Sequence, residues 1–272
     1  MMGEIFDQAP KKEKKTKKKT ETALAEKDKN QDVAISTVLK ENAELRQQMQ
    51  EDLGEFTEGM TLPLERIKLV AGGAGLFEFP EGDHRKEFYA VILDSHPANA
   101  FWQSTDDDKP RCWSPDGKVP APDVEEPVAA ECKVCPYNQF GSAGEGRRGK
   151  ACKNLRRMVL LMLDDSDEVP VGVPIRLTLP PTSLKYYAKY MSKLTARSIS
   201  PLAVVTKIMA DVDQVGEYKV TVVKFEKVKE LTVADYMKMR DLRQFALKYR
   251  PQPIAKEEYA NGSEPEIPEV PY

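Results

Sequence analysis

The sequence lacks any hydrophobic run long enough to cross a membrane, since a spanning helix needs about 20 apolar residues. It also lacks a secretory signal pattern, because lysines and not an apolar core follow the opening Met-Met-Gly-Glu. Cysteine is scarce as well: four residues in a chain of 272 do not make a disulfide scaffold. We therefore expect a cytoplasmic protein whose cysteines bind a metal or remain thiols.

Groups that would support catalysis are few. The chain has two histidines, and its acidic clusters at 106–108 and 164–165 fall where solvated turns are expected at strand ends. The segment 144–150 contains a GxGxxG pattern and nearly a phosphate loop, but no predicted strand leads into it. Ala151 also stands where Ser or Thr would have to hold magnesium. These features predict a binding protein and not an enzyme.

Charge is present in quantity but is segregated along the chain. The formal net charge is −3, yet residues 11–19 hold seven lysines and one glutamate, and residues 147–157 hold six Lys or Arg. Residues 256–272 hold five glutamates against one lysine. Such segregation indicates separate or competing partners for the two signs.

Composition divides the chain into four parts. Residues 1–32 predict a disordered, lysine-rich arm that either keeps the chain soluble or touches phosphates. Residues 33–53 predict a helix, and the apolar spacing within 35–49 is typical of a short coiled coil or a surface helix. Residues 61–250 predict the folded domain, and residues 251–272 an acidic, proline-rich, disordered tail.

The folded part predicts an α+β, mainly β domain. Its order of elements is typical of an OB-like barrel, which binds oligonucleotides across one face, although other small mixed sheets produce the same order. Residues 94–110 are predicted to be a polar segment that leaves the second strand. The predicted strands are 64–70, 88–93, 158–163, 174–179, 202–210 and 218–228, and the predicted helices begin at Thr182 or Ser183 and at Thr232.

All four cysteines lie within residues 111–157, which predict a zinc-ribbon-like insertion. The Cys-x-x-Cys pair lets two thiolates converge on one tetrahedral ion, and two distant cysteines complete the set. Free thiols and an iron–sulfur cluster are the alternatives, with His84 and His96 as possible replacement ligands. The predicted ligands of one structural Zn²⁺ are Cys112, Cys132, Cys135 and Cys152.

A glycine-rich basic loop between the last two cysteines is suited to a sugar–phosphate backbone. Aromatic side chains near cations favour stacking on the bases of a single strand. Lysines repeat every four residues on the helix predicted to begin at Thr182 or Ser183, and this spacing indicates either a solvated face or a contact surface. The predicted contacts are Arg147, Arg148, Lys150, Lys153, Arg156, Arg157, Lys185 and Lys189 for phosphates, and Trp102, Trp113, Tyr137 and Phe140 for bases.

The C-terminus resembles the acidic tails of bacterial and phage single-stranded-DNA-binding proteins, which end in an acidic, proline-containing stretch and an aromatic residue. In that family the tail docks replication and recombination proteins and competes with DNA for the basic groove. The residues that carry the likeness, and that the resemblance implies as partner-binding, are Glu266, Ile267, Pro268, Glu269, Val270, Pro271 and Tyr272.

The central region is similar to phage-encoded single-stranded-DNA-binding proteins in which a zinc site is inserted into an OB fold. The likeness rests on Cys112, Cys132, Cys135-Pro136, Phe140-Gly-Ser142 and Gly149-Lys-Ala-Cys152. The T-even-phage type uses a histidine among its ligands, whereas this chain offers four cysteines. The resemblance implies single-stranded-DNA binding in phage-type replication or recombination, in the host cytoplasm. Two alternatives stay open: a zinc-ribbon regulator of transcription or protein interaction that docks through helix 35–49, and an enzyme with a metal cluster.

Overall fold

The structure is a computed structural model that describes residues 42–56, 58–60, 63–104, 107, 109–144, 148–163, 174–215, 218–255 and 258. It divides into two units, 1–63 and 64–272. The described part of the first unit is mainly helix α3 (Ala43–Phe56), where the Asn42 side chain accepts a hydrogen bond from the Leu45 amide at 3.0 Å. The lysine-rich arm and residues 35–41 of the predicted coiled-coil segment lie outside the described residues. No helix in the described ranges is long and apolar enough to span a membrane.

The second unit is built on one curled sheet, in which nine strands are described. The strand order is β3-β2-β1-β7-β6-β4-β8-β9, and β5 pairs with β4 beside this path. Among the described pairs, β1 and β7 are parallel and the others are antiparallel. The strands are β1 (Arg66–Leu69), β2 (Phe77–Glu78), β3 (His84–Arg85), β4 (Glu87–Phe101), β5 (Cys112–Ser114), β6 (Lys153–Met162), β7 (Ile175–Leu179), β8 (Val204–Val215) and β9 (Tyr218–Glu230).

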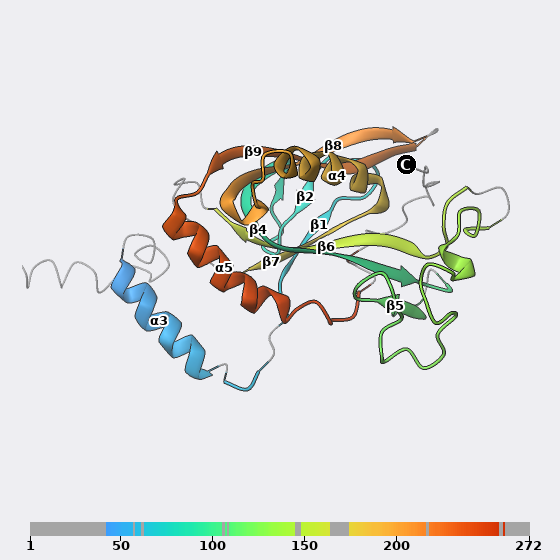
Figure 1. Ribbon diagram of the computed structural model, residues 1–272, viewed down its shortest axis with the longest axis horizontal. Coiled ribbons are helices and arrows are strands. Elements are labelled where there is room, and N and C mark those ends of the chain that lie inside the picture. Colours follow the sequence, from blue (N-terminus) through green and yellow to red (C-terminus); the bar gives the residue numbers. More distant parts are fainter. Residues whose placement is uncertain are drawn as a thin grey trace, which may run out of the picture. The chain divides into compact units, whose positions relative to one another are not determined.

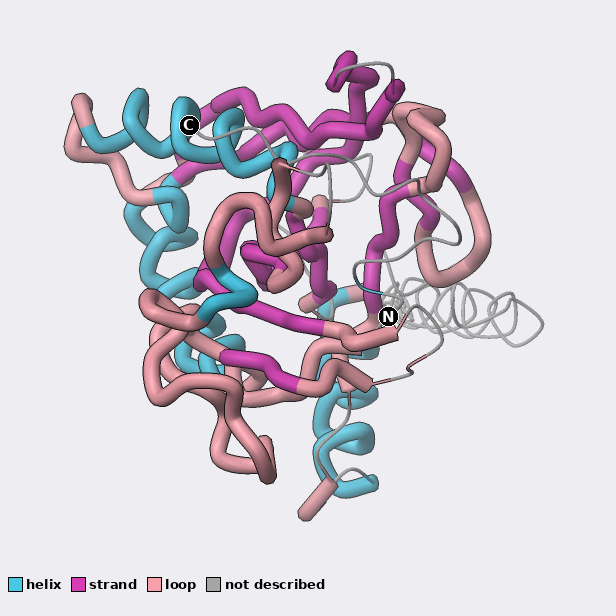
Figure 2. Tube along the Cα trace, turned by 90° about the vertical axis from the view of Figure 1, so that its right-hand side faces the viewer, coloured by secondary structure: helices cyan, strands magenta, loops and turns pink. Residues whose placement is uncertain are grey.

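The sheet curls into a half-barrel, with helix α4 (Pro181–Thr195) against one face and α5 (Val233–Leu247) against the other (Figures 1 and 2). On the α4 side the core is formed by Phe77, Ile92, Leu160, Tyr187 and other side chains. On the α5 side Val91, Leu161, Met239 and their neighbours form a second core. The predicted α+β, mainly β class is therefore confirmed.

Strand β4 pairs with three other strands of the sheet. It pairs with β6 from Ala90 to Ala100, with β8 from Glu87 to Ala90, and with β5 from Asn99 to Phe101. Between its β8 and β5 contacts, the edge of β4 away from β6 has no partner among the described strands. A bulge between Ile92 and Asp94 interrupts the β6 register at Leu93. As a result, Leu93 joins the α5-side core and Asp94 also points toward α5.

Two predictions about these strands need correction. The strand predicted at 88–93 continues to Phe101, so residues 94–101 are not a loop. The strand predicted at 158–163 begins five residues earlier, at Lys153. Polar side chains such as Asp94 and Asn154 predicted loops, but in the structure they are paired within a sheet. The short strands β2, β3 and β5 were not predicted.

The two helix starts differ in how well the sequence predicted them. Thr232 is the N-cap of α5, and its hydroxyl accepts a hydrogen bond from the Asp235 amide at 3.2 Å, as predicted. Helix α4 instead begins at Pro181 after an N-cap without a side-chain hydrogen bond. Ser183 is fully buried, and its hydroxyl accepts a hydrogen bond from the Val223 amide of β9 at 2.9 Å. This serine therefore ties α4 to the sheet and does not cap the helix.

Candidate nucleic-acid interface

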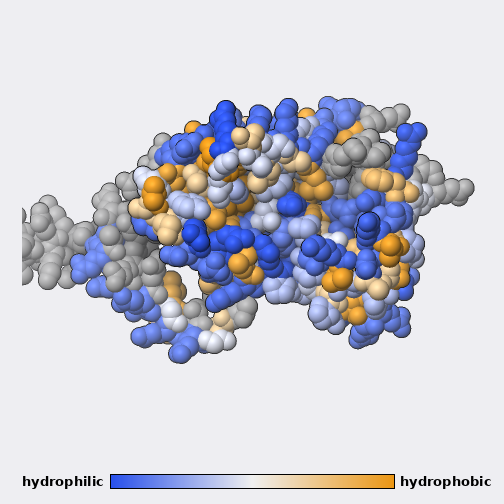
Figure 3. Space-filling view, viewed as in Figure 1, coloured by the Kyte–Doolittle hydropathy of each residue, from blue (hydrophilic) through white to orange (hydrophobic). Residues whose placement is uncertain are grey.

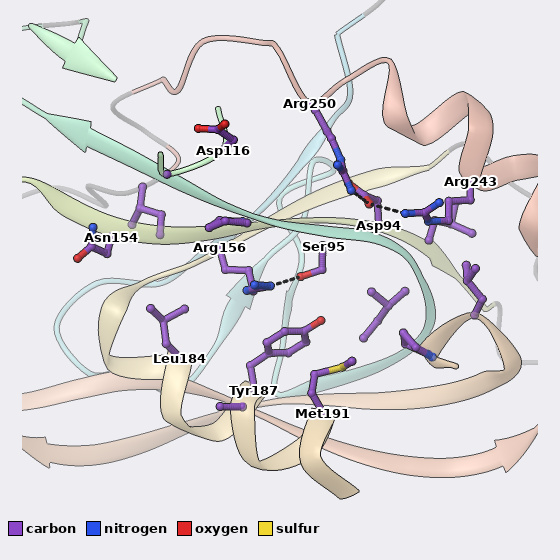
Figure 4. Close-up of a pocket in the computed structure, with 18 of the residues that line it drawn as sticks. Asp94, Ser95, Asp116, Asn154, Arg156, Leu184, Tyr187, Met191, Arg243 and Arg250 are labelled. Atoms are coloured by element: carbon purple, nitrogen blue, oxygen red, sulfur yellow. Dashed lines mark hydrogen bonds and ion pairs between the residues drawn. The ribbon is translucent and has the colours of Figure 1, made fainter. Parts of the chain in front are cut away.

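A groove of about 1050 Å³ runs along the unpaired edge of β4. Residues 92–99 of β4 form its floor, α4 supplies one wall and α5 the other (Figure 4). The bend at Asp116 to Lys118 closes one end. Because both helices pack on the sheet next to an edge that lacks a partner, the groove is open along its length.

The α5 wall is organised by one buried carboxylate. Asp94 is 4% exposed, and its Oδ2 accepts hydrogen bonds from Arg250 Nε at 2.8 Å and His96 Nδ1 at 3.0 Å. Arg243 lies 3.7 Å from Oδ1. Burial alone would raise the pKa of Asp94, but the Arg250 and His96 contacts outweigh it and hold this pKa well below its usual range. Asp94 is therefore ionised and positions two arginines at the groove.

The α4 wall is apolar with one cation above it. Leu184, Tyr187 and Met191 face the groove, and the Arg156 guanidinium lies 5.1 Å from the centre of the Tyr187 ring (Figure 4). Arg156 also donates a hydrogen bond to the Ser95 hydroxyl at 3.4 Å. Burial raises the pKa of Tyr187, so its hydroxyl is neutral at physiological pH. This wall offers hydrophobic surface beside a positive charge.

A chain of amides lies at the end of the groove near the cysteines. Asn154 Nδ2 donates to Asn99 Oδ1 at 2.7 Å and to Asn138 Oδ1 at 3.0 Å. Lys150 Nζ donates to Asn154 Oδ1 at 2.7 Å, and Asn138 Nδ2 donates to the Cys132 carbonyl at 2.8 Å. The amide chain therefore connects the groove to the cysteine hairpin by continuous hydrogen bonds.

The groove carries a positive balance of charge. Its lining includes the cations Arg156, Arg240, Arg243, Arg250 and Lys118 against the carboxylates Asp94 and Asp116. Hydrophilic side chains cover the surface between α4 and α5, with hydrophobic atoms visible beneath them (Figure 3). The arrangement therefore suits a ligand that combines negative charge with flat apolar groups.

The four cysteines line one cavity of about 20 Å³. Such a volume holds about one water-sized sphere, since a single water needs roughly 10–15 Å³ by this measure. Cys132, Cys135 and Cys152 are buried, and Cys112 is partly buried. Burial raises the pKa of Cys112, and the neighbouring Cys132 and Cys135 add to this increase. The thiols thus surround a common small space, although no group of three or more Cys, His, Asp or Glu in the described residues has the geometry of a metal site.

The backbone around the cysteines is held by local hydrogen bonds. The Cys135 amide donates to the Cys132 carbonyl at 3.4 Å, and the Cys152 amide donates to the Tyr137 carbonyl at 2.8 Å. Ser142 donates to the Tyr137 carbonyl at 2.8 Å and accepts from the Ala151 amide at 3.0 Å. These contacts bring the segment before Cys152 back to the Cys132–Cys135 hairpin.

The predicted phosphate contacts are spread over different surfaces. Arg156 lines the groove, Lys150 belongs to the amide chain, and Lys153 donates to the Lys150 carbonyl at 3.1 Å. Arg157, which follows Arg156 on β6, points to the opposite face and is 1% exposed. The remaining predicted cations, Arg148, Lys185 and Lys189, do not line the groove, and Arg147 lies outside the described residues.

The predicted stacking residues have mostly structural surroundings. Trp113 is buried, and Tyr137 stacks on Phe101 with ring centres 4.2 Å apart, so both help to enclose the cysteine cavity. Trp102 packs against the small core that contains Trp113. Phe140 is different because it is 49% exposed and lies 4.9 Å from Lys150 Nζ.

Sequence reasoning missed the α5 arginines. The last helix was predicted from its apolar face, and its polar face was not considered as a binding surface. Arg240 and Arg243 are three residues apart, so they share one side of a helix, and this spacing was a usable signal. Arg250 follows the helix and gave no such signal, since its position depends on Asp94 in a distant strand.

The fold and groove are thus those of a mainly β protein with a cationic, partly apolar binding surface. Comparisons with protein-family models, with curated proteins and with solved structures found no match.

Proposed function

We propose that this chain is a non-enzymatic single-stranded-DNA-binding protein that acts in phage-type DNA replication or recombination. The observation that carries the proposal is the groove along β4, where arginines from α5 and β6 stand beside an apolar wall. A single strand presents phosphates and exposed base faces together, and both can be accommodated in such a groove. In a finer description, the half-barrel is OB-like and residues 111–157 form a zinc-ribbon-like insertion in it.

The two walls have different roles in this proposal. Arg240, Arg243 and Arg250 neutralise phosphates, because their guanidinium groups lie on the open side of the groove. Bases lie against the α4 wall, where displacement of Arg156 from the Tyr187 ring would expose an aromatic face. Phe140 extends the stacking surface beyond the amide chain. The amide chain offers donors and acceptors at the end of the groove.

Titration with fluorescent oligo-dT over a range of salt concentrations tests the groove. The variant R240Q/R243Q removes two groove charges, and K193Q/K219Q removes two exposed lysines outside the groove lining as a matched control. For a single strand, each phosphate contact contributes about 0.7 to the slope of log K against log salt, so the groove variant should lower the slope by about 1.4. The control should leave it unchanged. Equal slopes for both variants, or no binding by the wild type, would refute the proposal.

The acidic tail enters the proposal through the resemblance. Residues 259–272 lie outside the described residues, and they follow Glu258 directly in the sequence. Fourteen residues reach at most about 50 Å when extended, which is enough to compete for a groove on the same chain. Deleting residues 264–272 should therefore strengthen oligo-dT binding at low salt and have little effect at high salt. Unchanged affinity for oligo-dT at both low and high salt would count against competition by the tail.

We also propose that Cys112, Cys132, Cys135 and Cys152 hold one structural Zn²⁺. Four thiolates around one ion-sized cavity match the donor set that structural zinc prefers. A bound zinc would supply a tetrahedral cross-link between the start of β5, the Cys132–Cys135 hairpin and the segment before β6. Metal analysis of the purified protein should find one equivalent of zinc, and Cys132→Ser should lower that content and the melting temperature together. Iron, or less than a tenth of an equivalent of zinc in protein purified without chelators, would refute this assignment.

The proposed setting of the protein follows from the same hypothesis. We place it in the cytoplasm, where replication and recombination proteins would meet the tail residues Glu266 to Tyr272. The segment 35–49 would support self-association, and its residues 43–49 form the first half of α3. Analytical ultracentrifugation of the full chain and of a form without residues 1–53 tests this self-association. Equal association states of the two forms would refute it.

A further inference from the structure

The segment after α5 crosses the α5-side face of the sheet. It begins at Arg250, which lies three residues after the end of α5 and is bound to Asp94, and it passes the small core near β5 (Figure 1). Ile254 is 1% exposed and packs in the same cluster as Trp113 and Leu155. The segment then brings Glu258 to β6 and β7. We call the described residues 250–255 and 258 the strap.

Glu258 fills a buried pocket of hydrogen-bond donors. Its side chain is 2% exposed, and its Oε2 accepts from Arg157 Nε at 3.1 Å and from the Thr178 hydroxyl at 2.9 Å. Its Oε1 accepts from Arg157 NH2 at 2.9 Å and from Arg176 NH1 at 3.2 Å. The Ala255 amide lies 3.4 Å from the same oxygen. Five donors therefore surround a single carboxylate, which has about four acceptor positions.

Among the described residues, the charges in this pocket do not balance. Two guanidinium groups with side chains 1% and 7% exposed share one carboxylate, and Arg66 also raises the local positive potential. Burial lowers the pKa of Arg176 to about 10, and the neighbouring Arg157 is the next largest cause, ahead of Glu258. A dianion would neutralise the pair more completely than a carboxylate does.

We propose that Arg157, Arg176 and Thr178 form a phosphate-binding site that Glu258 occupies in the structure described here. Two planar guanidinium forks and a hydroxyl are the donors that recognise the oxygens of a phosphate group. In this description Glu258 is a surrogate for the ligand, and the strap closes the site until a phosphate displaces it.

The site is separate from the groove. Arg156 and Arg157 are consecutive on β6, and their side chains point to opposite faces of the sheet, Arg156 toward the α4 wall and Arg157 toward the strap. Phosphate binding at the strap therefore does not require the groove to bind DNA. Phosphate binding would, however, release Glu258, which directly precedes residues 259–272 of the acidic tail.

Thermal unfolding in phosphate and in chloride at equal ionic strength tests the proposal. Glu258→Ala empties the site and should make the melting temperature sensitive to phosphate, whereas the wild type should respond less. A site with a millimolar Kd raises the melting temperature by about 3–6 °C at tenfold excess of ligand. Adding Thr178→Val to Glu258→Ala should reduce the response. Equal responses of Glu258→Ala and the wild type would overturn the proposal.

A second variant keeps the test informative if Glu258→Ala does not fold. Ile254→Ala loosens the strap and leaves the arginines and Glu258 in place, so it should respond to phosphate more than the wild type does. To distinguish the source of the phosphate group, the same measurement is made in the R240Q/R243Q variant, in which oligo-dT binding by the groove is weakened. Stabilisation by inorganic phosphate assigns a free anion, and stabilisation by oligo-dT alone assigns a nucleic-acid backbone. Stabilisation by neither refutes the site.

Discussion

Asp94→Asn is the most informative single change, because this one buried carboxylate holds Arg243, Arg250 and His96. Removing one partner of a buried ion pair typically destabilises a protein by about 3–5 kcal/mol. Arg250 has a side chain 40% exposed and can turn toward water, so the loss should be smaller here. We expect about 2 kcal/mol, which lowers the melting temperature by about 4–8 °C in a domain of this size.

The pH dependence of this loss has a defined sign. The pKa of Asp94 is lowered in the folded protein, so its contribution is complete above the unfolded value of 3.8 and disappears as the pH falls through the folded value. Urea unfolding of wild type and variant should therefore give the full difference at pH 8, where His96 is neutral in both proteins and Asp94 is ionised in the wild type. The difference should shrink below about pH 4, because the Asp94 carboxyl then takes up a proton in the unfolded wild type but stays ionised in the folded protein.

The same variant should affect the groove. Without the carboxylate, Arg243 and Arg250 are no longer held at one point, and oligo-dT binding should become weaker even though the groove gains one unit of positive charge. Arg197→Gln, an exposed change outside the groove lining, is the control for general charge effects. A stability difference below about 0.5 kcal/mol, or a difference that persists unchanged at pH 3, would refute the role given to Asp94.

Two further changes test the packing around the sheet. Gly73→Ala should cost at least about 1 kcal/mol more than Gly72→Ala, because both glycines have positive φ but only a Cβ at Gly73 would lie 2.7 Å from the Lys219 carbonyl oxygen. Equal losses in urea unfolding would contradict the close contact. Tyr190→Phe should destabilise the protein by about 1–2 kcal/mol, since the Tyr190 hydroxyl lies 2.6 Å from that of fully buried Thr206. Tyr218→Phe, at a 43% exposed position, is the matched control, and similar melting temperatures for the two variants would count against the buried hydrogen bond.

Local pattern was enough to predict some element boundaries closely. Apolar alternation predicted β7 within one residue, and the Thr232 cap predicted the start of α5. Both signals depend on neighbours in sequence, namely side-chain alternation in a strand and the first turn of a helix. The mainly β class followed from the sum of such signals.

The groove could not be predicted in the same way. The carboxyl-terminal half of β4 contains the buried residues Asp94 and Asn99, whose hydrogen-bond partners Arg250 and Asn154 come from remote segments. Arg250, which pairs with Asp94, is 156 positions away. The groove itself results from the separation of β8 and β5 along β4, and no local pattern reports where a strand edge lacks a partner.

The pairing of β4 has a consequence for how the chain acquires its structure during synthesis. Phe88 pairs with Ile208, 120 positions later, and β1 pairs with β7 over a similar separation. At about 5–20 residues per second, the ribosome needs about 6–24 s to add those residues. Throughout that interval the apolar residues of β4 have no β8 to cover them. Early pairing of β4 with β6 shortens this exposure, because β6 follows β4 in the chain sooner than β8 does.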